Sequence, residues 1–296
     1  LLLILIGMGA WWLVQRGLAP LQQFSRVAGK VTTQDLSHRL AVENLPRELS
    51  ELARGINVML DRLDAGVQQL SQFSDDLAHE LRAPLTNLMG KAQVTLSRAR
   101  APDEYKSALE SSTEELDRLA RIVADMLFLA QVSHPAARVS FTTVNLRDEA
   151  LRVMDLFALS AEDKGLRLNL AGDAWVLGDR LMIQRAISNL LSNAIRHSPH
   201  GSGIALQIDS HDQRVSLTVS NPGAGIEAQH LPHLFERFYR ADNSRARSEG
   251  GTGLGLAIVR SIISLHQGQA EATSVLGGVT SFRLIFPALS AAPKAP

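Results

Sequence analysis

Apolar residues recur every three or four positions through much of the first half of the chain, which predicts amphipathic helices. One stripe begins at residue 49 and continues to residue 96, and a second runs from residue 105 to residue 132. Between them, Pro102 and Asp103 are suited to a turn and to the start of a helix. We therefore expect residues 70–134 to form a helical hairpin, and pairing two hairpins in a dimeric four-helix bundle would cover both stripes.

The first 14 residues form an unbroken apolar run, LLLILIGMGAWWLV. Crossing a bilayer takes about 20 apolar residues. A signal peptide would have a positively charged start and a small-residue cleavage site, which this run lacks. Trp11 and Trp12, followed by Arg16, are instead typical of the cytoplasmic end of a membrane helix. We expect residues 1–16 to end a transmembrane helix and the sequence to be a mostly cytoplasmic fragment of a longer protein with a preceding sensing domain.

Residues 17–69 carry two short helical patterns separated by a connector. Pro20 stands at a helix-start position, the connector at residues 36–46 breaks the periodicity, and the second pattern begins near Leu49. Two amphipathic helices of this length cannot bury their apolar faces alone. We expect this segment to form part of a dimeric bundle as well.

Periodicity changes after His134-Pro135-Ala136-Ala137, which is the natural end of the helical region. Alternation of apolar and polar residues then predicts strands with one buried face, separated by helical patterns. This mixture over residues 138–289 predicts an α/β domain whose helices cover one face of a sheet. Residues 290–296 are expected to be a disordered tail. Strands are predicted at residues 166–170, 204–208, 215–219 and 281–286, and helices at 145–163, 180–196 and 254–266.

Composition excludes some classes of function but selects none. The 296 residues are 45% hydrophobic, enough for two or three modules, and 30 basic residues balance 30 acidic ones. Zero net charge gives no global electrostatic case for binding nucleic acid. The chain has no cysteine, so disulfide scaffolds, thiolate metal sites and cysteine nucleophiles are excluded. Function must be read from motifs.

His79 follows Leu77 by two positions, about 200° around a helix axis, so it points away from the apolar stripe. A lone outward histidine is usually an ordinary surface residue. This one is followed directly by Glu80, and Pro84 lies five residues further on within a strong helical pattern. Proline there removes a backbone hydrogen bond and bends the helix.

Polar side chains line one side of the predicted helix at residues 180–196. Asn189 and Asn193 are four positions apart, and Arg196 and His197 follow within one turn. A solvated helix face would explain these residues equally well. Asparagine is a modest helix former, however, and its amide oxygen suits a hard cation such as Mg²⁺ that also binds phosphate.

Two glycine-rich segments follow. Asn221-Pro222-Gly223-Ala224-Gly225-Ile226 ends a strand, where glycines permit close approach of a ligand and the Asn221 amide can bond a base edge. A polar stretch at residues 241–250, with Arg245 and Arg247, has the composition of a lid. The second segment, residues 250–259, runs into a helix whose N-terminus suits phosphates. It has neither the Gly-Lys-Ser/Thr of a P-loop nor the preceding strand of a Rossmann turn.

Together these motifs resemble the sensor histidine kinases of two-component signalling. His79-Glu80-Leu81-Arg82-Ala83-Pro84 resembles the phosphoacceptor box. Residues 17–69, with Pro20 and Glu48, resemble a HAMP relay module. Residues 189–198, 221–226, 234–240 and 251–256 are similar to the N box, first glycine box, F box and second glycine box. The wording of the first glycine and F boxes is most similar to the heavy-metal (copper or silver) sensor branch.

The resemblance implies a Bergerat-type (GHKL) ATP-binding domain and transfer of the γ-phosphoryl group to His79, with Glu80 orienting the imidazole. It also implies Mg²⁺ on Asn193, a homodimer anchored in the bacterial inner membrane through the N-terminal helix, and a response regulator whose aspartate receives the phosphoryl group. The ATP-binding residues that it implies are Asn189, Asn193, Arg196, His197, Asn221, Gly223, Gly225, Ile226, Arg245, Arg247, Gly251, Thr252, Gly253, Leu254, Gly255 and Leu256.

Two positions depart from the family pattern. Most members have aspartate where Asn221 stands, but an amide oxygen also accepts a hydrogen bond from the adenine amino group. Many members have Thr or Asn four residues after the histidine, where it positions a water that dephosphorylates the regulator. Ala83 has no polar group for that task. The alternatives are a GHKL-type ATPase, which needs no outward His79, and a catalytically silent dimeric scaffold.

Overall fold

The computed structural model describes residues 3–4, 6–9, 11–12, 35–43, 45–132, 140–211, 213–241 and 252–289. The chain divides into two compact units, Leu1–Leu85 and Thr86–Pro296. The first predicted helix of the HAMP-like segment, with Pro20, lies outside the described residues, as does the tail at 290–296. The described residues of the opening apolar run are helical. No helix within the described ranges is long and apolar enough to cross a bilayer.

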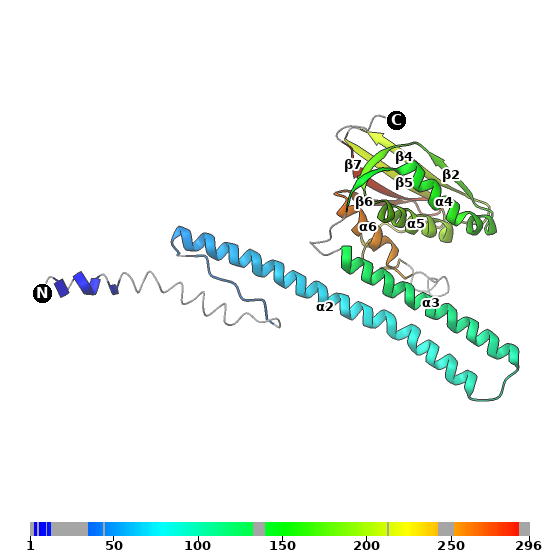
Figure 1. Cartoon of the computed structure of the whole chain (residues 1–296), viewed down its shortest axis with the longest axis horizontal. Coiled ribbons are helices and arrows are strands. Elements are labelled where there is room, and N and C mark those ends of the chain that lie inside the picture. The colour runs from blue at the N-terminus through cyan, green and yellow to red at the C-terminus, as the bar shows by residue number, and fades with distance from the viewer. Residues whose placement is uncertain are drawn as a thin grey trace. The chain divides into compact units, whose positions relative to one another are not determined.

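Helix α2 (Arg47–Leu96) is one uninterrupted helix (Figure 1). Its range contains the whole predicted stripe at residues 49–96 and His79. The connector before it is non-helical over residues 36–42, as predicted. Leu36 and Leu40 of the connector are each 5% exposed, as is Leu60 of α2, and Ala53 of α2 is fully buried. These side chains form a small apolar core within the first unit.

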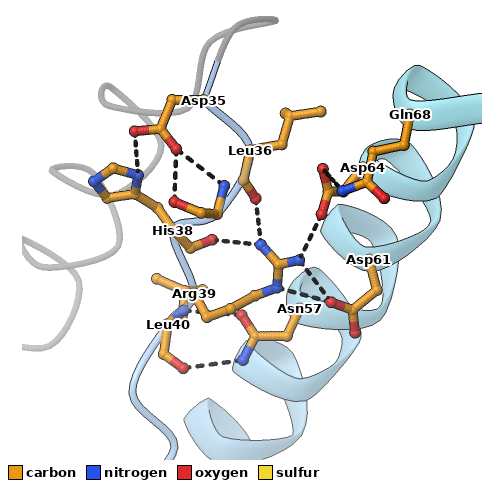
Figure 2. A network of polar contacts seen from close by, with 10 residues as sticks. Asp35, Leu36, His38, Arg39, Leu40, Asn57, Asp61, Asp64 and Gln68 are labelled. Atoms are coloured by element: carbon orange, nitrogen blue, oxygen red, sulfur yellow. Dashed lines mark hydrogen bonds and ion pairs between the residues drawn. The ribbon is translucent and has the colours of Figure 1, made fainter. Parts of the chain in front are cut away.

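Polar contacts hold the connector along α2 (Figure 2). The Arg39 guanidinium donates to the carbonyl oxygens of Leu36 and His38. It also donates to the Asp61 carboxylate, at 2.7–2.8 Å. The Asn57 side chain makes two hydrogen bonds to the backbone of Leu40 in the connector. It accepts from the Leu40 N–H at 2.8 Å and donates to the Leu40 carbonyl at 2.9 Å. The connector is therefore anchored through its backbone polar groups, which a strand-free segment must satisfy locally.

Helix α3 (Pro102–Val132) is the second arm of the hairpin. Near the turn, Lys91 Nζ of α2 donates to Ser111 Oγ of α3 at 2.7 Å. The far half of α3 buries four apolar side chains, Ile122, Met126, Leu129 and Val132, and packs against α6 (Gly255–Leu265). The near half leaves predicted stripe residues exposed in the single chain, with Leu109 at 68% and Leu116 at 56%.

The α/β domain confirms the predicted strand and helix patterns. Its main sheet has the order β2-β4-β5-β7-β6, with β2 and β4 parallel and the other pairs antiparallel. A separate antiparallel pair joins β1 to β3. The strands are β1 (Thr142–Asn145), β2 (Arg167–Ala171), β3 (Trp175–Gly178), β4 (Gly203–His211), β5 (Arg214–Pro222), β6 (Gln269–Ser274) and β7 (Val279–Pro287).

Helices α4 (Leu146–Asp163), α5 (Arg180–His197) and α6 lie against one face of the main sheet (Figure 1). That face is apolar because alternate residues of the central strands point to it, and Leu206, Leu217 and Leu284 are at most 1% exposed. Asn145 and Asp179 cap α4 and α5, each accepting a backbone N–H three residues on. A short 3₁₀ helix, Leu231–His233, lies between β5 and α6.

His266 joins the start of α5 to the end of α6. Its Nε2 accepts a hydrogen bond from the Asp179 N–H at 3.0 Å, and its Nδ1 pairs with the Ile262 carbonyl at 2.7 Å. The ring stacks on Phe141 with centroids 4.7 Å apart. An Nε2 that accepts a hydrogen bond must be unprotonated, so the folded protein holds a neutral imidazole here.

Stability should therefore fall as the pH drops below about 6.5, the ordinary pKa of histidine. Burial lowers the pKa of His266 in the folded protein, outweighing the Ile262 hydrogen bond and the Asp179 charge, which act in the opposite direction. The unfolded chain thus binds this proton at a higher pH than the folded chain. We expect denaturation midpoints measured from pH 7.5 to 5 to fall less steeply in His266→Gln than in the wild type. Equal slopes would contradict the assignment.

Candidate active site

His79 is exposed on α2, whereas Leu77 and Leu81 on the other side of the helix are half buried. The outward orientation predicted for His79 is thus confirmed. Glu80 directly follows and is half buried, and α2 continues as helix through the buried Pro84 to its end. The imidazole is accessible to another domain or protein from the solvent side of the helix.

Helix α5 turns its apolar side to the core and carries Asn189 and Asn193 outside that apolar side. Ile187 and Leu190 are fully buried, whereas Asn189 and Asn193 are half buried. Asn189 Nδ2 donates to the Arg185 carbonyl at 3.0 Å. Its Oδ1 would lie 3.0 Å from a β-carbon placed on Gly255, the first residue of α6. The predicted N box and second glycine box therefore meet.

Asn221 lies near the end of β5 and is 3% exposed. Its Nδ2 donates to the Pro222 carbonyl at 3.0 Å. Because the amide nitrogen is engaged in this way, Oδ1 is the acceptor that the side chain offers to a ligand. An amide held in this orientation has the polarity that an adenine amino group needs.

Gly223 and Gly225 cannot carry a side chain without displacing backbone. A β-carbon at Gly223 would lie 3.0 Å from the His197 carbonyl oxygen at the end of α5. Gly225 has φ +77°, and a β-carbon there would lie 2.3 Å from the Val275 carbonyl oxygen. The first glycine box is therefore packed between α5 and the β6–β7 turn.

Sequence reasoning missed two hydroxyls that support this loop. Ser274 Oγ accepts from the Ile226 N–H at 2.9 Å and lies 2.7 Å from Thr280 Oγ1. Thr280 is 6% exposed and pairs with Asn221 across β5 and β7. The alternating pattern of β7 was the available signal, but the predicted strand began at Ser281, one residue too late to include Thr280.

The second glycine box meets the F box. A β-carbon at Gly253, whose φ is +70°, would lie 2.8 Å from Phe238 Cα, and the Phe238 N–H donates to the Gly253 carbonyl at 2.9 Å. Leu254 is fully buried and precedes α6, whose N-terminus has no side-chain cap within the described residues. Backbone N–H groups at this end favour an anion, while Thr252 Oγ1 accepts from the Leu254 N–H at 3.3 Å.

These elements form a cradle with the chemistry of a nucleotide site. Asn221 would offer an acceptor to a base, the start of α6 would offer donors to phosphates, and Asn193 would offer an amide oxygen to Mg²⁺. Gly223, Gly225 and Gly253 stand where a β-carbon would meet the backbone of a neighbouring segment. Arg196 is half buried and His197 is exposed at the end of the same helix. Arg245, Arg247 and Gly251 lie outside the described residues.

Three family models match successive parts of the chain. Residues 12–65 match the HAMP domain, and residues 69–135 match the His Kinase A (phospho-acceptor) domain. Residues 178–290 match the histidine kinase-, DNA gyrase B-, and HSP90-like ATPase. Sensor histidine kinase CusS of Escherichia coli is 44% identical over 276 residues, which are 93% of this chain and 57% of that protein. The chain belongs to the sensor histidine kinase family.

Sensor protein IrlS of Burkholderia pseudomallei is 42% identical to this sensor histidine kinase, over 95% of this chain and 61% of that protein. Sensor protein CzcS of Cupriavidus metallidurans is 40% identical, over 93% of this chain and 58% of that protein. The chain thus spans about three fifths of the length of these relatives.

Solved structures of sensor histidine kinases share the fold. Acinetobacter baumannii histidine kinase AdeS aligns with a TM-score of 0.59 at 26% identity, over 71% of this chain and 97% of that one. Histidine kinase ThkA, solved in complex with response regulator protein TrrA, aligns with a TM-score of 0.64 at 24% identity, over 76% of this chain and 64% of that one. The predicted succession of helical region and α/β ATPase domain is confirmed.

Proposed function

We propose that the chain is the kinase portion of a transmembrane sensor that phosphorylates His79 with ATP and passes the phosphoryl group to an aspartate of a response regulator. The observation that carries the proposal is the meeting of α5, the Asn221 loop and the uncapped start of α6, which pack closely against one another through glycines. The exposed His79, on a helix outside the α/β domain, supplies the acceptor.

In the proposed reaction, Nε2 of the neutral His79 imidazole attacks the γ-phosphorus in line. The N–P bond forms as the bond from phosphorus to the bridging oxygen breaks, and ADP leaves with that electron pair. Glu80 orients the ring and accepts the hydrogen bond, and then the proton, of Nδ1–H. Such transfer depends chiefly on positioning and charge stabilisation.

The α/β domain would hold both ends of the nucleotide. Asn221 Oδ1 accepts from the adenine amino group, and the start of α6 and Arg196 surround the phosphates. Asn189 and Asn193 face the same side, and Asn193 binds Mg²⁺, which neutralises phosphate charge when present. Arg245, Arg247 and Gly251 are proposed to complete the phosphate site on the strength of the motif alone.

Dimerisation follows from surface that the single chain leaves uncovered. Leu109 and Leu116 of α3 and Met89 of α2 are each more than half exposed, with fractions of 68%, 56% and 56%. Two hairpins packed as a four-helix bundle would bury these residues. The proposed organisation is a membrane-helix end at 1–16, HAMP at 17–69, the hairpin at 70–134 and the ATP-binding domain at 138–289. Its place is the bacterial inner membrane, with this portion cytoplasmic.

The stimulus is proposed to be a heavy metal. The motifs Asn-Pro-Gly-x-Gly-Ile and Leu-Phe-Glu-Arg-Phe-Tyr-Arg are similar to those of the heavy-metal (copper or silver) sensor branch of the family. Growth of cells carrying the whole protein in graded copper or silver, with phosphorylation of the regulator as readout, tests this part separately. A response to neither metal would remove the metal assignment and leave the kinase proposal in place.

Incubation of the chain with ATP labelled at the γ-phosphate tests the kinase proposal. We expect label that is lost in acid and retained in alkali, as a phosphorus–nitrogen bond requires. Release of inorganic phosphate without labelled protein would favour the GHKL-type ATPase. Absence of Mg-dependent ATP binding would favour the silent scaffold.

A further inference from the structure

Lys164 connects α4 to the end of α5, although 31 residues separate it from the nearer partner. Its Nζ donates to the carbonyl oxygens of Ile195 and Arg196, each at 3.0 Å, and both contacts are partly buried. These carbonyls belong to the last turn of α5, where backbone oxygens lack helical partners and carry the negative end of the helix dipole. A lysine ammonium satisfies both requirements at once.

The backbone of Lys164 ties the same region a second time. Lys164 is the C-cap residue of α4, and its carbonyl accepts from the Gly201 N–H at 3.1 Å, in the turn that follows α5. Another of the end carbonyls, that of Ala194, accepts from Ser198 through both N–H at 3.0 Å and Oγ at 2.6 Å. The last turn of α5 is therefore held from outside by Lys164 and from within by Ser198.

This turn is the part of α5 that meets the first glycine box. The His197 carbonyl, next along the chain from Arg196, is the oxygen that would lie 3.0 Å from a β-carbon on Gly223. A displacement of a few tenths of an ångström at this turn would move it into or away from the glycine loop. The same turn carries the side chain of Arg196.

We propose that Lys164 is a positioning residue of the nucleotide site. Its ammonium holds the final turn of α5 in register with the Asn221–Ile226 loop, so that Arg196 and the glycine backbone reach the nucleotide together. Lys164 acts through that turn and does not contact the nucleotide. The inference rests on the proposed function, since it takes the α5 turn and the glycine loop to bind ATP.

The test compares Lys164→Met, which keeps the aliphatic stem but removes the donors, with Lys164→Arg, which keeps them. Autophosphorylation at varied ATP should give Lys164→Met a KM raised about tenfold and a maximal rate within about twofold of the wild type, because ATP binding is affected more than transfer. Lys164→Arg should restore KM to within about threefold. The matched control is Lys106→Met, whose side chain is 76% exposed on α3.

Hydrogen exchange without nucleotide gives a readout independent of activity. Backbone amides of residues 196–198 and 223–226 should exchange faster in Lys164→Met than in the wild type and Lys164→Arg. Unchanged exchange there, or a lowered melting temperature with wild-type KM, would overturn the proposal. If Lys164→Met does not fold, Lys164→Gln, which retains one amide donor, takes its place under the same criteria. Failure of the wild type to bind ATP would refute the proposed function, while the exchange result would still decide what Lys164 holds in place.

Discussion

His79→Gln is expected to abolish acid-labile labelling of the chain by γ-labelled ATP. Glutamine occupies similar space and keeps polar atoms, but it has no nucleophilic ring nitrogen with a neutral lone pair at physiological pH. Because His79 is exposed, the substitution removes little packing, and we expect the melting temperature to change by less than about 2 °C. Mg-dependent ATP binding should also remain, since the proposed nucleotide residues belong to the α/β domain.

His200→Gln is the matched control. His200 is also exposed, but it lies in the turn after α5. Its substitution should leave at least half of the labelling rate. Persistence of acid-labile label in His79→Gln would show that another residue is the acceptor and would refute the site assignment. Loss of label in both variants would point to a general effect on the nucleotide domain.

The core elements of the α/β domain could be predicted because their apolar residues recur with a strong period. Helix α5 was predicted at residues 180–196 and is found at Arg180–His197, and the predicted strand at 215–219 lies within β5. Both elements bury one complete face, so their apolar residues recur with an unambiguous period. The single continuous helix α2 could be predicted because its apolar residues recur every three or four positions, from the HAMP-like segment to the end of the hairpin's first arm.

Strands with little apolar content or with only four residues were missed. Strand β6 reads QAEATS and lies at the edge of the sheet, with no residue that is fully buried. Strands β1 and β3 have only four residues each, too few to establish a period of two. Their positions depend on backbone pairing with distant segments, and that information is not local to the sequence.

The candidate site also has one part that could be predicted from the sequence and one part that could not. Glycines and asparagines in four ordered boxes could be recognised from the residues, and the structure brings Asn189 to Gly255 and Gly223 to the end of α5. The supporting contacts could not be recognised in this way. Serine, threonine and lysine are common residue types. The roles of Ser274 and Lys164 depend on partners dozens of residues away, and Thr280 bonds Ser274 across the β6–β7 turn. Nothing in a single sequence separates them from solvated surface residues.

Asn193→Ala is expected to lower Mg-dependent autophosphorylation by about 100-fold or more, because a metal ion on transferring phosphates supplies several kcal/mol of charge stabilisation. The fold should survive. Asn193 is half buried in the second-last turn of α5, and alanine is the better helix former by about 0.7 kcal/mol, so the melting temperature should stay the same or rise slightly.

A magnesium titration distinguishes loss of one Mg²⁺ ligand from loss of the whole nucleotide site. If Asn193 binds the ion, the variant should need much more Mg²⁺ for half-maximal labelling, while metal-free binding of the adenine moiety through Asn221 should be little changed. Asn169→Ala, an exposed asparagine on β2, is the matched control and should behave as the wild type. A variant at Asn193 with an unaltered Mg²⁺ requirement would refute the metal role, and the proposed placement of phosphates between α5 and the start of α6 would then rest on Arg196 and the backbone of α6.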